Sequence, residues 1–272
     1  MFFFVIVQII GLLVGNVIIA DLTKNPYVNN LVVTNDINEP MNAGFFLVYV
    51  LFGAVFIIIL IRMNFLRDIL FKILEFFMIA GSSSIVFYAI LRLIFGYDIS
   101  TTGGTVLGLI LSGIKFYKPE IKNLAAIIST AGVGVVFGIS MGITPMIIFL
   151  ALLAIYDFVA VFLTKHMVEM ANFVVKNDLA FTVTAREPAA VKGEKERRVD
   201  LGTGDLVAPV MMEVSLLSIS PLASIIVFVG AIISTGIFIW LVKDKKVVLP
   251  ALPPIVIGMM ISFAIGKFIG AY

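Results

Sequence analysis

Long apolar runs, separated by short polar segments, fill most of this chain of 272 residues. A helix needs roughly 20 apolar residues to cross a bilayer, since each main-chain N–H and C=O must find its partner within the segment. Hydrophobic residues make up 61% of the chain and charged residues only 13%, whereas soluble domains carry about 25% charged residues. The polar side chains are too few to cover a water-exposed surface. The sequence therefore predicts an all-α integral membrane protein in contact with the lipid bilayer.

Charges and Pro/Asn clusters divide the apolar runs into nine predicted membrane-spanning helices. They lie at about Phe2–Ala20, Ala43–Ile61, Ile69–Phe95, Thr101–Ile114, Leu124–Ile139, Pro145–Leu163, Leu201–Leu217, Pro221–Val242 and Pro254–Ile269. The first has no basic leader, so we expect a retained helix and not a cleaved signal peptide. The fourth, fifth, seventh and ninth are shorter than a bilayer requires, which favours water-filled surroundings or helices that begin inside the membrane.

One long polar connection divides the chain into three parts. Residues 1–163 hold the first six helices, residues 164–200 form a loop, and residues 201–272 hold the last three helices. If the connections alternate between the two sides, starting with the N-terminus inside, only Lys24, Arg92 and Lys267 of the 19 Lys and Arg residues fall outside. Because cytoplasmic connections are rich in Lys and Arg, we expect a cytoplasmic N-terminus, a cytoplasmic loop and an outside C-terminus.

The loop contains two kinds of segment. The stretch Lys192–Arg198 is dense in charges, which is typical of a solvated connection. In the segment Ala180–Ala185, apolar Phe181 and Val183 alternate with threonines. This alternation is typical of a short strand, but an irregular loop accounts for the same residues equally well.

Pairs of glycines four residues apart occur in several predicted spans. They are Gly104 and Gly108, Gly134 and Gly138, Gly138 and Gly142, and Gly266 and Gly270. Such pairs let membrane helices approach one another closely. We interpret them as packing sites that specify no chemistry.

Four acids lie inside predicted spans, where a carboxylate costs about 2.5–3.5 kcal/mol on insertion scales. Glu75 follows Lys72 by three residues, and a local ion pair accounts for it. Glu213 lies in the outer half of its span, where its side chain could extend to the interface or bond a neighbouring helix. Asp157 has no basic residue beside it, and Asp205 follows two glycines where the loop meets the seventh span. Hydroxyl groups across helices could satisfy Asp157 structurally, but two acids flanking one loop also suggest a functional pair.

Asp157 and Asp205 could meet if their helices are antiparallel neighbours. In a low-dielectric site two close carboxylates cannot both ionise readily, so the pair shares a proton. The charged member then takes a proton from water, and the neutral member polarises an amide carbonyl, as in aspartic proteases. Two further features accompany the pair. Pro209 removes the amide that would bond the Asp205 carbonyl, and Pro250-Ala251-Leu252-Pro253 keeps the start of the ninth span extended.

Three motifs occur in order on the sixth, seventh and ninth predicted spans. They are Tyr156-Asp157, Gly202-Thr203-Gly204-Asp205 and Pro250-Ala251-Leu252-Pro253. Together they resemble the signatures of the GxGD intramembrane aspartyl proteases, the family of presenilins and signal peptide peptidases. The short connections look most like a microbial presenilin homologue, and the inside position of the loop is similar to presenilins.

The resemblance implies an intramembrane aspartyl endopeptidase with Asp157 and Asp205 as the catalytic pair. Tyr156, Gly202, Thr203, Gly204 and the motif Pro250–Pro253 would bind substrate or shape the active site. Thr203 stands where presenilins commonly have leucine. The substrates would be transmembrane proteins with an outside N-terminus. An extended substrate segment could add to the Ala180–Ala185 segment or to the Arg197–Leu201 segment through main-chain hydrogen bonds. Oligomers or accessory subunits are possible partners. The location would be the cell membrane in a microbe and an endomembrane in a eukaryote.

A second function stays open on the residues alone. Intramembrane acids, helix-breaking residues and short spans are also typical of a transporter or cation channel. The chain has no cysteine and a single histidine, His166, which disfavours metal sites. The net charge of +2 argues against nucleic-acid binding. We therefore expect no metal, no cofactor and no nucleic-acid partner.

Overall fold

The computed structural model describes residues 1–62, 67–163, 166–187, 197–242 and 249–272. Most of these residues are helical. The helices are α1 (Phe2–Asp21), α2 (Pro26–Asn29), α3 (Met41–Arg62), α4 (Arg67–Arg92), α5 (Tyr97–Tyr117), the short 3₁₀ helix η1 (Pro119–Ile121), α6 (Lys122–Ser140), α7 (Ile143–Phe162), α8 (His166–Lys176), α9 (Thr203–Leu217), α10 (Pro221–Val242) and α11 (Leu252–Phe268). The strands are β1 (Thr182–Glu187) and β2 (Arg197–Gly202).

Each predicted span falls on a helix: α1, α3 to α7, and α9 to α11. Among the described residues, seven helices are long and apolar enough to cross a membrane. The prediction that the fourth and fifth spans are short is wrong, because these helical segments cover 21 and 22 residues. At the polar start of α5, Thr101 and Thr102 donate hydrogen bonds to carbonyls four residues earlier, so their hydroxyl groups are satisfied within the helix. The seventh and ninth are indeed short, with 15 residues in α9 and 17 in α11.

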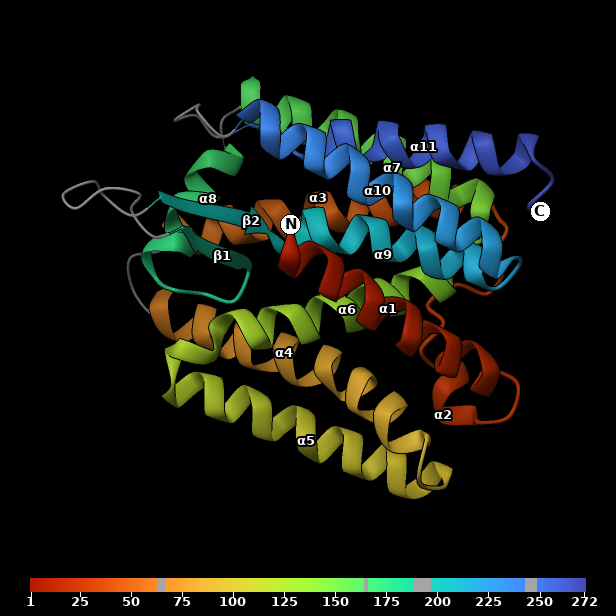
Figure 1. The fold of residues 1–272 in the computed structure, drawn as a ribbon. Coiled ribbons are helices and arrows are strands. Elements are labelled where there is room, and N and C mark those ends of the chain that lie inside the picture. The colour runs from red at the N-terminus through yellow and green to blue at the C-terminus, as the bar shows by residue number, and fades with distance from the viewer. Residues whose placement is uncertain (63–66, 164–165, 188–196, 243–248) are drawn as a thin grey trace.

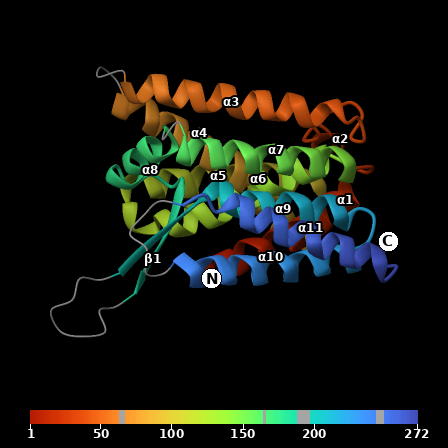
Figure 2. The same cartoon turned by 90° about the horizontal axis from the view of Figure 1, so that it is seen from above.

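The helices form one bundle in which α9 lies centrally. Figure 2 shows α3 along one side of the bundle and α10 along the opposite side. In Figure 1, α5 lies outermost on a further side, and α4 separates it from α6. Helix α9 packs against α1, α6, α7, α10 and α11. Because protein surrounds α9, its polar first turn avoids lipid, which explains how a helix of 15 residues is tolerated at membrane depth.

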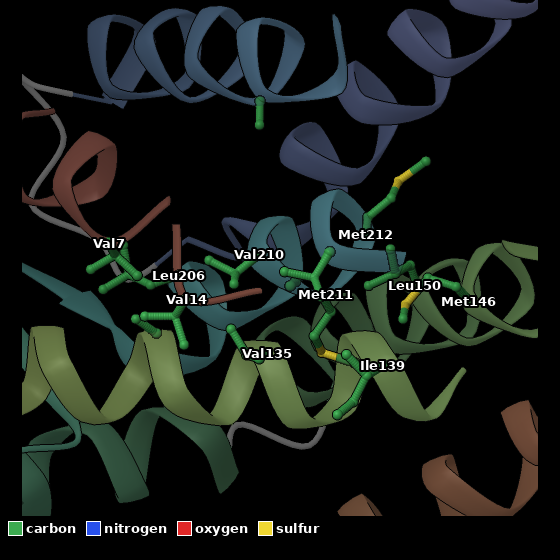
Figure 3. Close-up of a cluster of buried hydrophobic side chains, with 14 of the residues drawn as sticks. Val7, Val14, Val135, Ile139, Met146, Leu150, Leu206, Val210, Met211 and Met212 are labelled. Atoms are coloured by element: carbon green, nitrogen blue, oxygen red, sulfur yellow. The ribbon is translucent and has the colours of Figure 1, made fainter. Parts of the chain in front are cut away.

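Glycines bring α6 close to α9. A Cβ atom on Gly134 would lie 2.6 Å from the Val210 side chain, and one on Gly138 would lie 2.7 Å from that of Val214. Real side chains do not pack so closely, so glycine is needed at both positions. Figure 3 shows Val210 of α9 in the buried cluster that it forms with Val135 of α6 and other apolar side chains. The predicted packing role of this glycine pair is confirmed.

The other glycine pairs differ in what they contact. A Cβ on Gly104 or Gly108 of α5 would lie within 3.0 Å of main-chain atoms of α4, so this pair also packs as predicted. Gly142 precedes α7, where a Cβ would meet Asn38. For Gly266 and Gly270 the prediction is wrong, because Gly270 lies beyond the end of α11 with φ of 72°. At that position glycine allows a left-handed turn.

The long polar connection contains α8 and an antiparallel hairpin. Strand β1 pairs with β2 in a register that sets Thr182 opposite Gly202 and Thr184 opposite Asp200. The strand interpretation of the Ala180–Ala185 segment is confirmed for Thr182 onward. The charge-dense stretch is partly outside the described residues, since 188–196 are not among them, and its end belongs to β2. In Figure 1 the hairpin lies beyond the start of α9, with β1 on the side of α6.

Candidate active site

Asp157 lies near the end of α7 and is almost completely buried, with 3% of its surface exposed. Its Oδ2 atom accepts a hydrogen bond of 3.3 Å from the main-chain N–H of Leu252. Among the described residues, the hydrogen-bond partner of this carboxyl is thus a main-chain amide and not a hydroxyl group of another helix, the structural explanation considered from the sequence. A main-chain donor at the start of another helix holds the acid instead.

Asp205 lies in the first turn of α9, which begins at Thr203 with Gly202 as its N-cap. The free N–H groups at a helix start favour a carboxylate there. The main-chain N–H of Gly202 donates to the Asp205 carboxyl, and Asp157 lies close enough for its charge to act on the same group. Helices α7 and α9 are in contact. The structure thus brings the two predicted acids into electrostatic contact.

The two glycines before Asp205 have different surroundings. A Cβ atom on Gly202 would lie 3.2 Å from Oδ2 of Asp205, which is tighter than ordinary packing. Gly204 is exposed and has open space around its Cα. Gly202 therefore lets the carboxyl approach the main chain, whereas Gly204 leaves the neighbouring space empty.

The proline motif forms the start of α11. Ala251 is the N-cap and α11 begins at Leu252, so the prediction that the motif stays extended is wrong for Leu252 and Pro253. Proline fits the first turn of a helix, where its missing N–H would have no acceptor. Pro250, Ala251 and Leu252 are buried, and Pro253 is half-buried. Because the first N–H groups of a helix have no acceptor within the helix, the Leu252 amide is available to Asp157. The sequence identified this motif, but it gave no sign of the amide that makes the contact.

An apolar cavity of about 280 Å³ is lined by Asp157 and by Thr203 and Gly204, the two residues directly before Asp205. Among the predicted site residues, Tyr156, Asp157, Thr203, Gly204 and Leu252 line it. The remaining wall comes mainly from apolar side chains of α3, α4, α6, α7 and α9, and from the chain that leads into β1. In such a low-dielectric space a pair of carboxyl groups can share one proton and act on a water molecule.

Sequence reasoning assigned the wrong partner to Glu75. This acid is buried and pairs with Lys115 of α5, not with Lys72. Lys72 lies instead over the ring of Phe116, 5.9 Å from its centroid. Glu75 also accepts a hydrogen bond from the main-chain N–H of Ala180, just before β1. The acid therefore connects two membrane helices to the hairpin, a role that depends on tertiary packing and has no local sequence signal.

Glu213 of α9 is a further acid within the bundle. Glu213 is fully buried, and neither of its carboxyl oxygens has a hydrogen-bond partner within the described part of the chain. Neither of the two alternatives considered from the sequence, a side chain that reaches the interface or one that bonds a neighbouring helix, describes this buried carboxyl among the described residues. Within the same residues, no group of three or more His, Cys, Asp or Glu side chains is placed to hold a metal ion.

Comparisons with known proteins cover the whole chain. The family model described as "Signal-peptide peptidase, presenilin aspartyl protease" matches residues 1–271. Two solved structures of a presenilin family intramembrane aspartate protease, in the C222 and P2 space groups, have a similar fold. The first is 18% identical, with a TM-score of 0.67 over 99% of this chain and 96% of the other. The second is 20% identical, with a TM-score of 0.64 over 97% of each chain. Among curated proteins no relative matches.

Proposed function

Because this chain belongs to the signal-peptide peptidase and presenilin family of aspartyl proteases, we propose that Asp157 and Asp205 are its catalytic pair. Membership of this family makes the protein an aspartic endopeptidase that cleaves within the membrane. Its several apolar helices agree with a multi-pass integral membrane protein. The family therefore accounts for the intramembrane acids, and the transporter or channel considered from the sequence is not needed to explain them.

The observation that carries the proposal is the electrostatic contact between Asp157 and Asp205 beside an apolar cavity. With one proton between them, the charged carboxyl accepts a proton from the attacking water. The neutral carboxyl donates a hydrogen bond to the carbonyl oxygen of the scissile peptide bond. The Leu252 amide holds the Asp157 carboxyl in a fixed orientation during both steps. No metal or cofactor takes part in this scheme.

The substrates are membrane proteins, and we propose that the cut lies within their transmembrane segments. A substrate helix must unwind there, because a helical main chain keeps its carbonyls bonded and shielded. An extended substrate segment would then add to the hairpin through main-chain hydrogen bonds. Tyr156, Thr203 and Gly204, which line the cavity, would contact the substrate next to the cut bond.

The proposed orientation sets the N-terminus and the hairpin in the cytoplasm and the C-terminus outside. The distribution of Lys and Arg along the chain supports it. This arrangement selects substrates with an outside N-terminus and lets water reach the acids from the cytoplasmic side. In a microbe the protein would lie in the cell membrane, and in a eukaryote in an endomembrane. Oligomers or accessory subunits stay possible partners.

The direct test uses purified protein in lipid nanodiscs. Its substrate is a single-span protein whose N-terminus lies outside in the cell. Mass spectrometry of the fragments should locate the cut within the apolar span. Fragments cut only in the flanking polar segments would contradict intramembrane cleavage by this chain. In proteoliposomes, an ion flux that persists after both aspartates are changed to alanine, with no cleavage by the unmodified protein, would favour the channel.

A further inference from the structure

Side chains from other helices occupy the outer edge of β1. Asn123 of α6 donates from Nδ2 to the main-chain carbonyl of Thr184 at 2.8 Å, and its Oδ1 atom accepts from the Thr184 N–H at 3.0 Å. Four residues earlier, the Ala180 N–H donates to Oε1 of Glu75 at 2.5 Å. Lys115 holds this carboxylate in turn. One helix of the bundle, α6, is therefore bonded to the main chain of β1, and a second, α4, to the segment directly before it.

These contacts show which edge of the hairpin the side chains of the bundle occupy. In an antiparallel pair, the main-chain groups of every second residue point away from the partner strand. The Thr203 N–H donates to the Phe181 carbonyl, whereas both main-chain groups of Thr184 bond Asn123. The main-chain N–H and C=O groups of the even-numbered residues of β1 therefore point away from β2. Since Thr184 lies opposite Asp200, the N–H and C=O of Asp200 face away from β1 on the other edge.

The edge of β2 that faces away from β1 leads to the active site. Gly202 lies two residues after Asp200, so its N–H belongs to the same edge. That N–H donates to the carboxyl of Asp205. A peptide that pairs with β2 along this edge would therefore run directly up to a proposed catalytic acid. A peptide on the β1 edge would be separated from Asp205 by the width of the hairpin, about two strand spacings of roughly 4.8 Å each.

We infer that Asn123 is a positioning residue for proteolysis, which closes the β1 edge and fixes the hairpin so that substrate pairs only with β2. The inference rests on the proposed function. An asparagine amide suits this task because it presents one acceptor and one donor side by side, as a neighbouring strand does. It satisfies Thr184 but cannot extend the sheet. An unpaired edge would otherwise accept any extended segment.

The test compares three variants in the full-length protein. Asn123→Ala removes both bonds to Thr184, and Asn123→Asp keeps only the acceptor for the Thr184 N–H. Asn177→Ala is the matched control, because Asn177 directly follows α8 at an exposed position and its amide bonds only the Phe173 carbonyl of that helix among the described contacts. Hydrogen exchange of residues 180–187 is measured without substrate. Cleavage positions, kcat and KM are measured with the single-span substrate, and thermal unfolding is recorded for each variant.

For Asn123→Ala we expect exchange at Thr184 to rise at least about fivefold, as for the loss of a bond worth about 1 kcal/mol. We also expect KM to rise and the cuts to spread over neighbouring peptide bonds. The exchange rate and KM of Asn123→Asp should lie between those of Asn123→Ala and the unmodified protein, and those of Asn177→Ala should not change. Unchanged exchange at Thr184 would show that Asn123 does not hold the edge of β1. Unchanged cut positions and KM despite faster exchange would overturn the positioning role. If the unmodified protein does not cleave at all, the proposed function fails. The exchange measurement still tests whether Asn123 holds the edge of β1.

Discussion

The main-chain N–H of Leu252 lies 3.3 Å from Oδ2 of Asp157, so the first turn of α11 donates a hydrogen bond to an acid on α7. This bond gives the proline motif a physical purpose. Pro253 has no N–H of its own, and the amides at a helix start have no acceptor within the helix. One main-chain donor is thus left free at the position where Asp157 needs a partner.

Replacing the Leu252 amide by an ester, through incorporation of the α-hydroxy analogue of leucine, should lower kcat. The ester keeps the side chain but removes the N–H, and hydrogen bonds to charged groups contribute about 1.5–3 kcal/mol, equivalent to roughly 10- to 100-fold. The same ester at Ile255 is the control, because its amide bonds Ala251 within the helix. Equal kcat values for the two esters would contradict a role of the Leu252 amide in catalysis.

The rate should depend on pH as a bell-shaped curve. At low pH both carboxyl groups are protonated and no base remains, whereas at high pH both are ionised and no acid remains. The profile of kcat is measured in nanodiscs from about pH 3 to about pH 9, across the range in which carboxyl groups titrate in proteins. A rate that keeps rising or stays level across this range would be incompatible with a shared proton.

The sequence predicted the helices and the placement of the three motifs on them well, because the length of an apolar run and the positions of Gly and Pro are local properties. It also predicted β1, since alternation is a local signal. It missed the hydrogen bonds of the Leu252 amide with Asp157 and of Asn123 with Thr184, which form only when distant segments pack together. It misassigned Glu75 for the same reason. Lys72 is the nearer base along the chain, but Lys115 is the nearer base in space. Main-chain donors in particular leave no trace in residue identity.

Gly132→Ala should destabilise the protein. A Cβ atom at this position of α6 would collide with the main-chain carbonyl of Ser82 on α4, and overpacking of this kind costs about 1–3 kcal/mol. Gly113→Ala is the control, since nothing lies within 4 Å of its added Cβ. This second change should stabilise α5 by up to about 1 kcal/mol. Thermal unfolding in one detergent compares the two, and equal unfolding temperatures would contradict the close approach of α4 and α6.

Glu213→Met should leave the protein as stable or more stable. Neither carboxyl oxygen of this buried acid has a partner among the described residues, and an unsatisfied buried polar group costs about 1–3 kcal/mol. Methionine has a similar length and no polar hydrogen-bonding need. Glu75→Met is the contrasting change, because it leaves Lys115 buried without its acid. A fall in unfolding temperature as large for Glu213→Met as for Glu75→Met would show that the Glu213 carboxyl has a stabilising partner.

The central claim, that Asp157 and Asp205 act as one catalytic pair, is tested most directly by the cleavage rate of Asp157→Asn and Asp205→Asn. Both variants keep the shape of the side chain, and Glu213→Gln serves as a control that changes an acid on α9 outside the cavity. We predict that each aspartate variant folds normally but loses at least about 100-fold in kcat, in keeping with the usual contribution of a general acid or base, while the control cleaves as the unmodified protein does. Cleavage by either aspartate variant at a rate close to that of the control would contradict the account.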